Sequence, residues 1–204
     1  MTLAELERAA AHKPDALSDL SDSLVFGEGA EDAALMIVGE APGEAEDSSG
    51  RPFVGRAGQL LDKILVSVEL DRDEVYITNL VKRRPPGNRN PRPDEIDASA
   101  PILLEQIRII RPHVIATLGN VPTQWFLDTN DGITRLHGRW HDWNGVRLMP
   151  LYHPAYLLRN PSRERGGPKW QMWQAMKELT STLEQLRDRT PPSVGGASRQ
   201  QGLF

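Results

Sequence analysis

Glu40, Asn79 and His153 each stand at or just beyond the end of a short apolar run that has the length of a buried strand. Because parallel strands end along the same edge of a sheet, these three side chains are expected to converge on one pocket. Phe53, in the loop that follows Glu40, would add a flat apolar surface. A carboxylate, an amide, an imidazole and an aromatic ring together suit a planar heterocyclic ligand.

The chemistry of these groups fits a pyrimidine base. The Asn79 amide has one acceptor and two donors, so it can pair with N3–H and O4 of uracil, whereas cytosine presents the opposite pattern. Cleavage of an N-glycosidic bond leaves negative charge on the departing base, and a His153 donor near O2 would stabilise that charge. The Glu40 carboxylate could orient water or favour a cationic sugar.

The elements needed to position these residues are present in the pattern of the chain. Short apolar runs predict strands at 35–38, 75–79, 114–118 and 147–151, and helical patterns separate most of them. This alternation predicts an α/β fold with a parallel sheet covered on both faces. Pro101 is expected to interrupt the helix that follows Pro93, with Ser99 capping the second piece.

The loop 39–58 is the segment on which the pocket depends. It carries five glycines, two prolines and four carboxylates, and it leads directly into an apolar helical pattern. In open parallel sheets, ligands bind at loops in this position. Taken alone, a glycine-rich acidic loop would suit a phosphate or a metal as well as a base.

Three segments resemble the motifs of the family 4 uracil-DNA glycosylases. Residues 39–58 match the first motif, residues 76–86 match the second region, and residues 153–159 match the third. The match covers roughly residues 25–186. The resemblance implies the fold of the uracil-DNA glycosylase superfamily, which is a three-layer α/β/α arrangement around a four-stranded parallel sheet.

The resemblance also implies roles for individual residues. Glu40 would position or activate water, and Phe53 would stack on a uracil flipped out of DNA. Asn79 would read the edge of that base, and His153 would stabilise it as it leaves. Glu46 lies where the family suggests a side chain that blocks the thymine methyl group. The expected substrate contacts are Gly39, Ala41, Pro42, Gly43, Glu46, Phe53 and Asn79.

Contacts with DNA are expected from two segments. The basic residues among the prolines and glycines of 82–92 could form a solvated loop, but beside a glycosylase pocket they favour phosphate contact and a binding affinity that falls with salt. The segment after His153 resembles a loop that enters the minor groove, with Leu157 or Leu158 as the wedge that helps to flip the base. The expected DNA contacts are Lys82, Arg84, Arg89, Leu157, Leu158 and Arg159.

The sequence departs from the family in one respect. Family 4 enzymes normally hold a [4Fe–4S] cluster with four cysteines, and this chain contains no cysteine. By local spacing, the four positions fall near His12 and Asp15 and on Arg83 and Ser99, none of which suits a cluster. We therefore expect no cofactor, and we expect other contacts, such as an Asp15–Arg83 ion pair, to tie the amino-terminal helix to the rest of the domain.

Composition sets the remaining expectations. The chain has 204 residues and a net charge of −4, so overall charge does not predict a nucleic-acid partner. A single domain is expected at 1–188, followed by a flexible tail at 189–204. The tail ends in a sequence that resembles the peptide with which partners bind the bacterial sliding clamp, through Gln200, Leu203 and Phe204. A monomeric cytoplasmic protein without membrane spans is expected.

Two function classes compete on these observations. The first is a monofunctional uracil-DNA glycosylase that hydrolyses the N-glycosidic bond and initiates base excision repair. The alternative is a protein that binds uracil or abasic sites, or senses damage, with little or no turnover. Covalent capture of the abasic sugar, as in an unusual branch of the superfamily, lacks support because the His-bearing loop of that branch is not seen after Arg84.

Overall fold

The computed structural model describes residues 1–162, 164–186, 188–192 and 194. A six-stranded sheet forms its centre, in the order β1-β3-β2-β4-β6-β5. The strands are β1 (Glu28–Gly29), β2 (Leu35–Gly39), β3 (Tyr76–Asn79), β4 (Val114–Leu118), β5 (His141–Trp143) and β6 (Val146–Leu151). The helices are α1 (Leu3–Ala10), α2 (Glu44–Ser49), α3 (Arg56–Val66), α4 (Pro93–Ile110), α5 (Asn120–Leu127), α6 (Ile133–Leu136), α7 (Pro154–Arg159) and α8 (Pro168–Leu186), with 3₁₀ turns η1 (Asp15–Leu17), η2 (Arg72–Glu74) and η3 (Pro86–Asn88).

The sheet has six strands instead of the expected four. Strands β3, β2, β4 and β6 are parallel neighbours, and they coincide with the four apolar runs of the sequence. Strand β1 adds to one edge and β5 to the other, both antiparallel. These edge strands have two and three residues, too few to produce an alternating apolar pattern.

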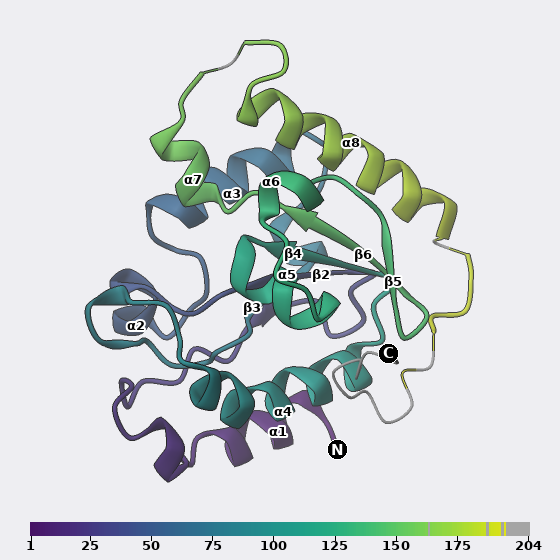
Figure 1. Ribbon diagram of the computed structural model, residues 1–204. Coiled ribbons are helices and arrows are strands. Elements are labelled where there is room, and N and C mark those ends of the chain that lie inside the picture. The colour runs from purple at the N-terminus through teal and green to yellow at the C-terminus, as the bar shows by residue number, and fades with distance from the viewer. Residues whose placement is uncertain (163, 187, 193, 195–204) are drawn as a thin grey trace.

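Helices cover both faces of the sheet, which gives three layers (Figure 1). Alternate side chains of β2 point to opposite faces. Met36 and Val38 join the apolar cluster beneath α1 and α4, whereas Leu35 and Ile37 join the cluster beneath α3 and α8. The parallel core strands are therefore buried on both sides, and their carboxyl ends share one edge.

The predicted break in the helix that follows Pro93 is wrong. Helix α4 runs unbroken through Pro101, and buried Ser99 accepts a hydrogen bond from the backbone N–H of Lys82 instead of capping a helix. Pro101 lies on the exposed side of the helix, as does Asp97, the residue whose carbonyl is left without its usual donor. Within the expected tail, Val194 is only 4% exposed and packs in the apolar cluster beneath α1 and α4, and the flexibility of 189–204 stays a prediction. Residues 195–204, which include Gln200, Leu203 and Phe204, lie outside the described part of the chain.

In the part of the chain that the structure describes, no helix has the length and apolarity to cross a membrane.

Candidate functional site

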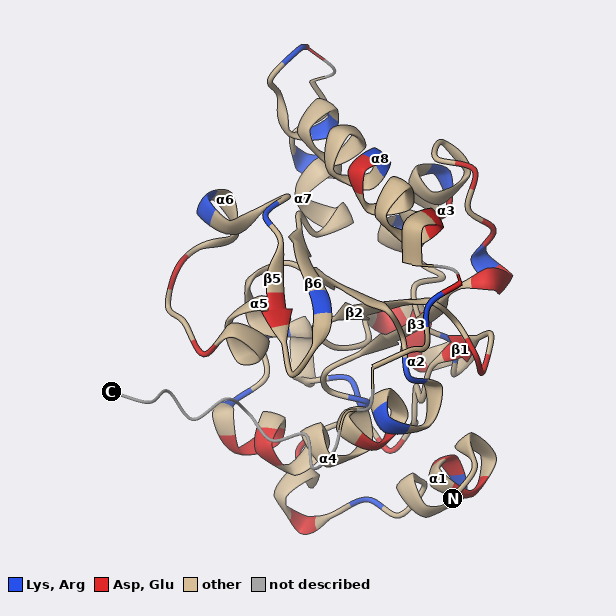
Figure 2. Ribbon diagram, turned by 90° about the vertical axis from the view of Figure 1, so that its right-hand side faces the viewer, with Lys and Arg blue, Asp and Glu red and all other residues tan. Residues whose placement is uncertain are grey.

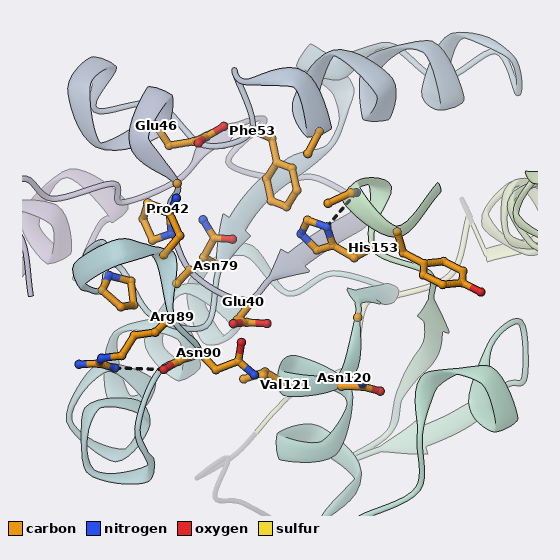
Figure 3. A pocket seen from close by; sticks show the side chains of 18 of the residues that line it. Glu40, Pro42, Glu46, Phe53, Asn79, Arg89, Asn90, Asn120, Val121 and His153 are labelled. Carbon is orange, nitrogen blue, oxygen red and sulfur yellow. Dashed lines mark hydrogen bonds between the residues drawn. The ribbon is translucent and has the colours of Figure 1, made fainter. Parts of the chain in front are cut away.

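A cavity of about 640 Å³ opens at the carboxyl edge of the sheet. Glu40 follows β2, Asn79 ends β3 and His153 follows β6, and all three side chains line the cavity together with Phe53 (Figure 3). The sequence thus correctly predicted that these four residues would share one pocket. Of the other expected substrate contacts, the lining includes Ala41, Pro42, Gly43 and Glu46.

Asn79 presents an unpartnered amide oxygen at this cavity. The residue is 2% exposed, and its Oδ1 has no hydrogen-bond partner among the described residues. Gly39 gives the amide its space, because a Cβ there would lie 2.3 Å from Asn79 Oδ1 and 2.5 Å from Phe53 Cζ. A buried acceptor without a partner is costly, so this oxygen is suited to a donor supplied by a ligand.

His153 is held as a neutral hydrogen-bond donor. It is the N-cap of α7, and its Nδ1 accepts a hydrogen bond of 3.1 Å from the backbone N–H of Ala155. Burial lowers the pKa of His153 to about 4, with a smaller contribution from Arg159. With Nδ1 acting as an acceptor, the single proton of the neutral ring sits on Nε2 and can be donated to a ligand.

Glu40 supplies a carboxylate beside these groups. Its backbone carbonyl accepts the N–H of Val81 at 3.0 Å, which fixes the start of the loop against the segment after β3. Burial raises the pKa of Glu40 above its usual value of 4.5. A partly desolvated carboxylate close to a base site can act on a water molecule or on a cationic sugar.

These two pKa shifts predict an acid limb in the pH–rate profile set by Glu40. The rate should rise with pH as Glu40 ionises, with a midpoint above 4.5, and should then stay level from about pH 6 to 8 because His153 is already neutral. Glu40→Gln should lower the rate and shift the limb down to about pH 4, where His153 gains its proton. Single-turnover rates on an oligonucleotide that carries uracil, the substrate that the family resemblance implies, test this. A limb near pH 6.5 that persists in Glu40→Gln would contradict a neutral His153.

Phe53 and Glu46 both line the cavity, and both lie in the upper part of the view in Figure 3. Phe53 is 6% exposed, and its ring centroid lies 5.9 Å from that of His153. Glu46 Oε1 accepts hydrogen bonds from the backbone N–H groups of Val54 at 3.0 Å and Gly55 at 2.8 Å. Glu46 therefore fixes the loop that carries Phe53, and its role against the thymine methyl group stays a prediction.

Some cavity residues were missed from the sequence. Asn120 lines the cavity at the start of α5, just beyond the end of β4, and its Oδ1 accepts a hydrogen bond of 2.7 Å from Ile133 N–H. The rule that led to Glu40, Asn79 and His153 could have found it, because the run 114–118 was identified as a strand. Further lining residues are Asn88, Asn90, Val121, Ile133 and Tyr156.

Two of the expected DNA contacts are wrong. Lys82 is 1% exposed, and its Nζ donates to Thr78 Oγ1, Asn79 O and Gln106 Oε1 at 2.6–2.7 Å, so it cannot reach a phosphate. Leu157 is 1% exposed in the apolar cluster beneath α3 and α8, so it cannot act as a wedge. In both cases the side chain turns inward to complete a core that the local sequence does not reveal.

The other four expected contacts remain accessible to different degrees. Leu158 and Arg159 are exposed on α7, and Arg159 also lines the cavity. Arg89 lines the cavity too, but its guanidinium forms two hydrogen bonds, of 2.6 and 2.8 Å, with buried Glu95. Arg84 donates to Asn88 at 2.7 Å. Figure 2, which views the molecule from the right-hand side of Figure 1, shows basic and acidic segments interspersed along the chain.

The residues at the cluster positions do not fit an iron–sulfur cluster. Arg83 is 2% exposed, and its guanidinium donates to the carbonyl oxygens of Ala10, at 3.3 Å, Ala11, at 2.9 Å, and Asp22. These bonds tie the carboxyl end of α1 to the segment after β3. The expected partner Asp15 was wrong, but the expected link between the amino-terminal helix and the domain is present.

The comparisons with known proteins agree with this geometry. A family model described as "Uracil DNA glycosylase superfamily" matches residues 26–177, and the chain belongs to this superfamily. It is 49% identical over 144 residues to the Type-4 uracil-DNA glycosylase of Thermotoga maritima, which covers 70% of this chain and 75% of that protein. It is 48% identical over 146 residues to the Type-4 uracil-DNA glycosylase of Saccharolobus solfataricus, a match that covers 67% of this chain and 68% of that protein. Identity to the Type-5 uracil-DNA glycosylase of Pyrobaculum aerophilum is 33% over 148 residues, a match that covers 64% of this chain and 65% of that protein. The likeness to family 4 inferred from the three motifs is confirmed.

Proposed function

We propose that this chain is a monofunctional uracil-DNA glycosylase that flips uracil out of DNA, hydrolyses its N-glycosidic bond and so initiates base excision repair. The observation that carries the proposal is the unpartnered Oδ1 of Asn79 in a cavity shared with Phe53 and a neutral His153. That oxygen can accept N3–H of uracil while the amide nitrogen donates to O4. The names of the Type-4 relatives support the same activity.

The reaction follows from what each side chain can do. When the C1′–N1 bond breaks, its electron pair stays on the base, and Nε2–H of His153 donates to the oxygen O2 on which charge develops. Glu40 orients a water molecule toward C1′ and accepts a proton from it as the new C–O bond forms. The departing uracil anion then takes a proton from solvent. Phe53 stacks on the base throughout.

Base flipping and the lack of strand cleavage each have support in the structure. Exposed Leu158 can occupy the place that the flipped nucleotide leaves, while Arg159 contacts a phosphate. Among the described residues that line the cavity there is no lysine, which argues against a Schiff base and strand cleavage. Sliding-clamp binding and a monomeric state stay predictions.

An excision assay tests the proposal. The purified chain is incubated with oligonucleotides that carry uracil, thymine or cytosine at one position, and abasic sites are revealed with alkali. We expect cleavage of the uracil strand alone, only after alkali, and a rate about 100-fold lower for His153→Ala. If the chain binds the uracil strand without excising the base, the proposal of a glycosylase is contradicted and the damage-sensing alternative is favoured.

A further inference from the structure

Phe53 has a backbone conformation that the loop would not adopt by itself. Its φ is +50°, in the left-handed region that favours glycine. Its carbonyl also sits so close to α3 that a Cβ at Gly58 would lie 1.8 Å from Phe53 O. A strained residue of this kind persists only when its surroundings fix it firmly, and such residues cluster at functional sites.

Arg72 supplies contacts that fix this conformation. It lies in η2, nineteen residues along the chain, and its Nη2 donates to Pro52 O at 2.6 Å while its Nη1 donates to Phe53 O at 3.2 Å. On the far side of the loop, Glu46 accepts the next two backbone N–H groups. The loop is therefore held through its carbonyl oxygens on one side and through its amides on the other.

The guanidinium of Arg72 is itself fixed on both sides. Nε and Nη2 donate to Glu28 Oε1 at 3.0 and 2.7 Å, and Nη1 donates to Asp62 Oδ1 at 2.6 Å. Together with the two loop carbonyls, these acceptors engage all five N–H donors that an arginine has. A lysine in this place would keep the charge but has only three donors on a single nitrogen, so it could not engage the same acceptors.

We propose that Arg72 is a positioning residue for Phe53, and that it sets the plane on which the flipped base stacks. This inference rests on the proposed function of the cavity. Stacking on an aromatic ring stabilises a bound base, so a displaced ring weakens substrate recognition measurably. Arg72 does not touch the base and acts only through the loop.

A double-mutant cycle tests the catalytic part of the inference. Arg72→Lys should lower kcat/KM for uracil excision about tenfold in the natural chain, and less than twofold when Phe53 is already alanine. Arg51→Lys is the matched control, because Arg51 also pairs with Glu28, at 2.8 Å, but is exposed and is not bonded to the carbonyls of residues 52 and 53. An equal loss in both backgrounds overturns the proposal.

Hydrogen exchange tests the same inference without relying on catalysis. The amides of Val54 and Gly55 should exchange about tenfold faster in Arg72→Lys and unchanged in Arg51→Lys. Asp62→Asn, which weakens one anchor of Arg72, should give an intermediate rate if Arg72→Lys does not fold. Unchanged exchange in the Arg72 and Asp62 variants overturns the proposal. If the natural chain excises no uracil, the proposed function fails, and the exchange rates still decide whether Arg72 positions the loop.

Discussion

Asn79→Ala is expected to reduce the single-turnover rate of uracil excision about 1,000-fold, because it removes both hydrogen bonds that distinguish uracil and leaves the buried edge of the base unpaired. The loss should exceed that of His153→Ala, which removes a single donor. Inhibition by free uracil should weaken in parallel, since the same amide binds the product. Rates on uracil oligonucleotides and inhibition constants for uracil measure both effects.

The design of the Asn79 experiment separates recognition from folding. The amide Oδ1 of Asn79 has no hydrogen-bond partner among the described residues, so its removal breaks no hydrogen bond to this oxygen within the protein. The melting temperature should therefore change little. Asn130→Ala, at an exposed loop position, is the matched control and should leave the rate unchanged. A rate for Asn79→Ala within threefold of the natural chain would rule out Asn79 as the residue that recognises the base.

Arg83→Ala is expected to destabilise the fold more than any surface substitution. It removes three hydrogen bonds from a buried guanidinium and leaves the carbonyl oxygens of Ala10, Ala11 and Asp22 without that donor. Unsatisfied buried groups cost about 1–3 kcal/mol each, so we expect a loss of about 3 kcal/mol. For a chain of this size, that loss corresponds to a fall in melting temperature of about 6–12 °C.

Calorimetry or urea unfolding measures the effect of Arg83→Ala. Arg84→Ala is the matched control, because the neighbouring arginine bonds to Asn88 at the surface and should change stability by less than about 1 kcal/mol. Asp15→Ala should also have little effect, since Asp15 is exposed and is not bonded to Arg83. Equal stability of Arg83→Ala and the natural chain would show that the link to α1 contributes nothing.

The sequence predicted the centre of the site well because its residues obey a rule of topology. Glu40, Asn79 and His153 follow three parallel strands, and strand ends are recognisable from short apolar runs. Phe53 was placed at the site by its position in the loop after Glu40, and its role in stacking came from the family resemblance. Its strained backbone and its dependence on Arg72 could not be predicted, because the contacts join loops far apart in the chain.

The two wrong DNA contacts have a common physical origin in side-chain direction. Lys82 lies in a basic stretch that resembles a phosphate-binding loop, yet its backbone is bonded to Val25 and to Ser99 at positions that turn the side chain into the core. Leu157 and Leu158 are neighbours of the same type, and only the packing of α7 decides which one is buried. Composition cannot supply such directions, whereas the tertiary structure does.

The hydrogen bonds of Arg83 also determine the chemical nature of the link between α1 and the rest of the domain. A guanidinium keeps its charge throughout the physiological pH range, cannot be stripped by a chelator and is not consumed by oxidants. It is a side chain of the polypeptide, so its presence at this position requires no separate step of metal supply. The Arg83 contacts between α1 and the segment after β3 are therefore made by groups that the polypeptide itself supplies.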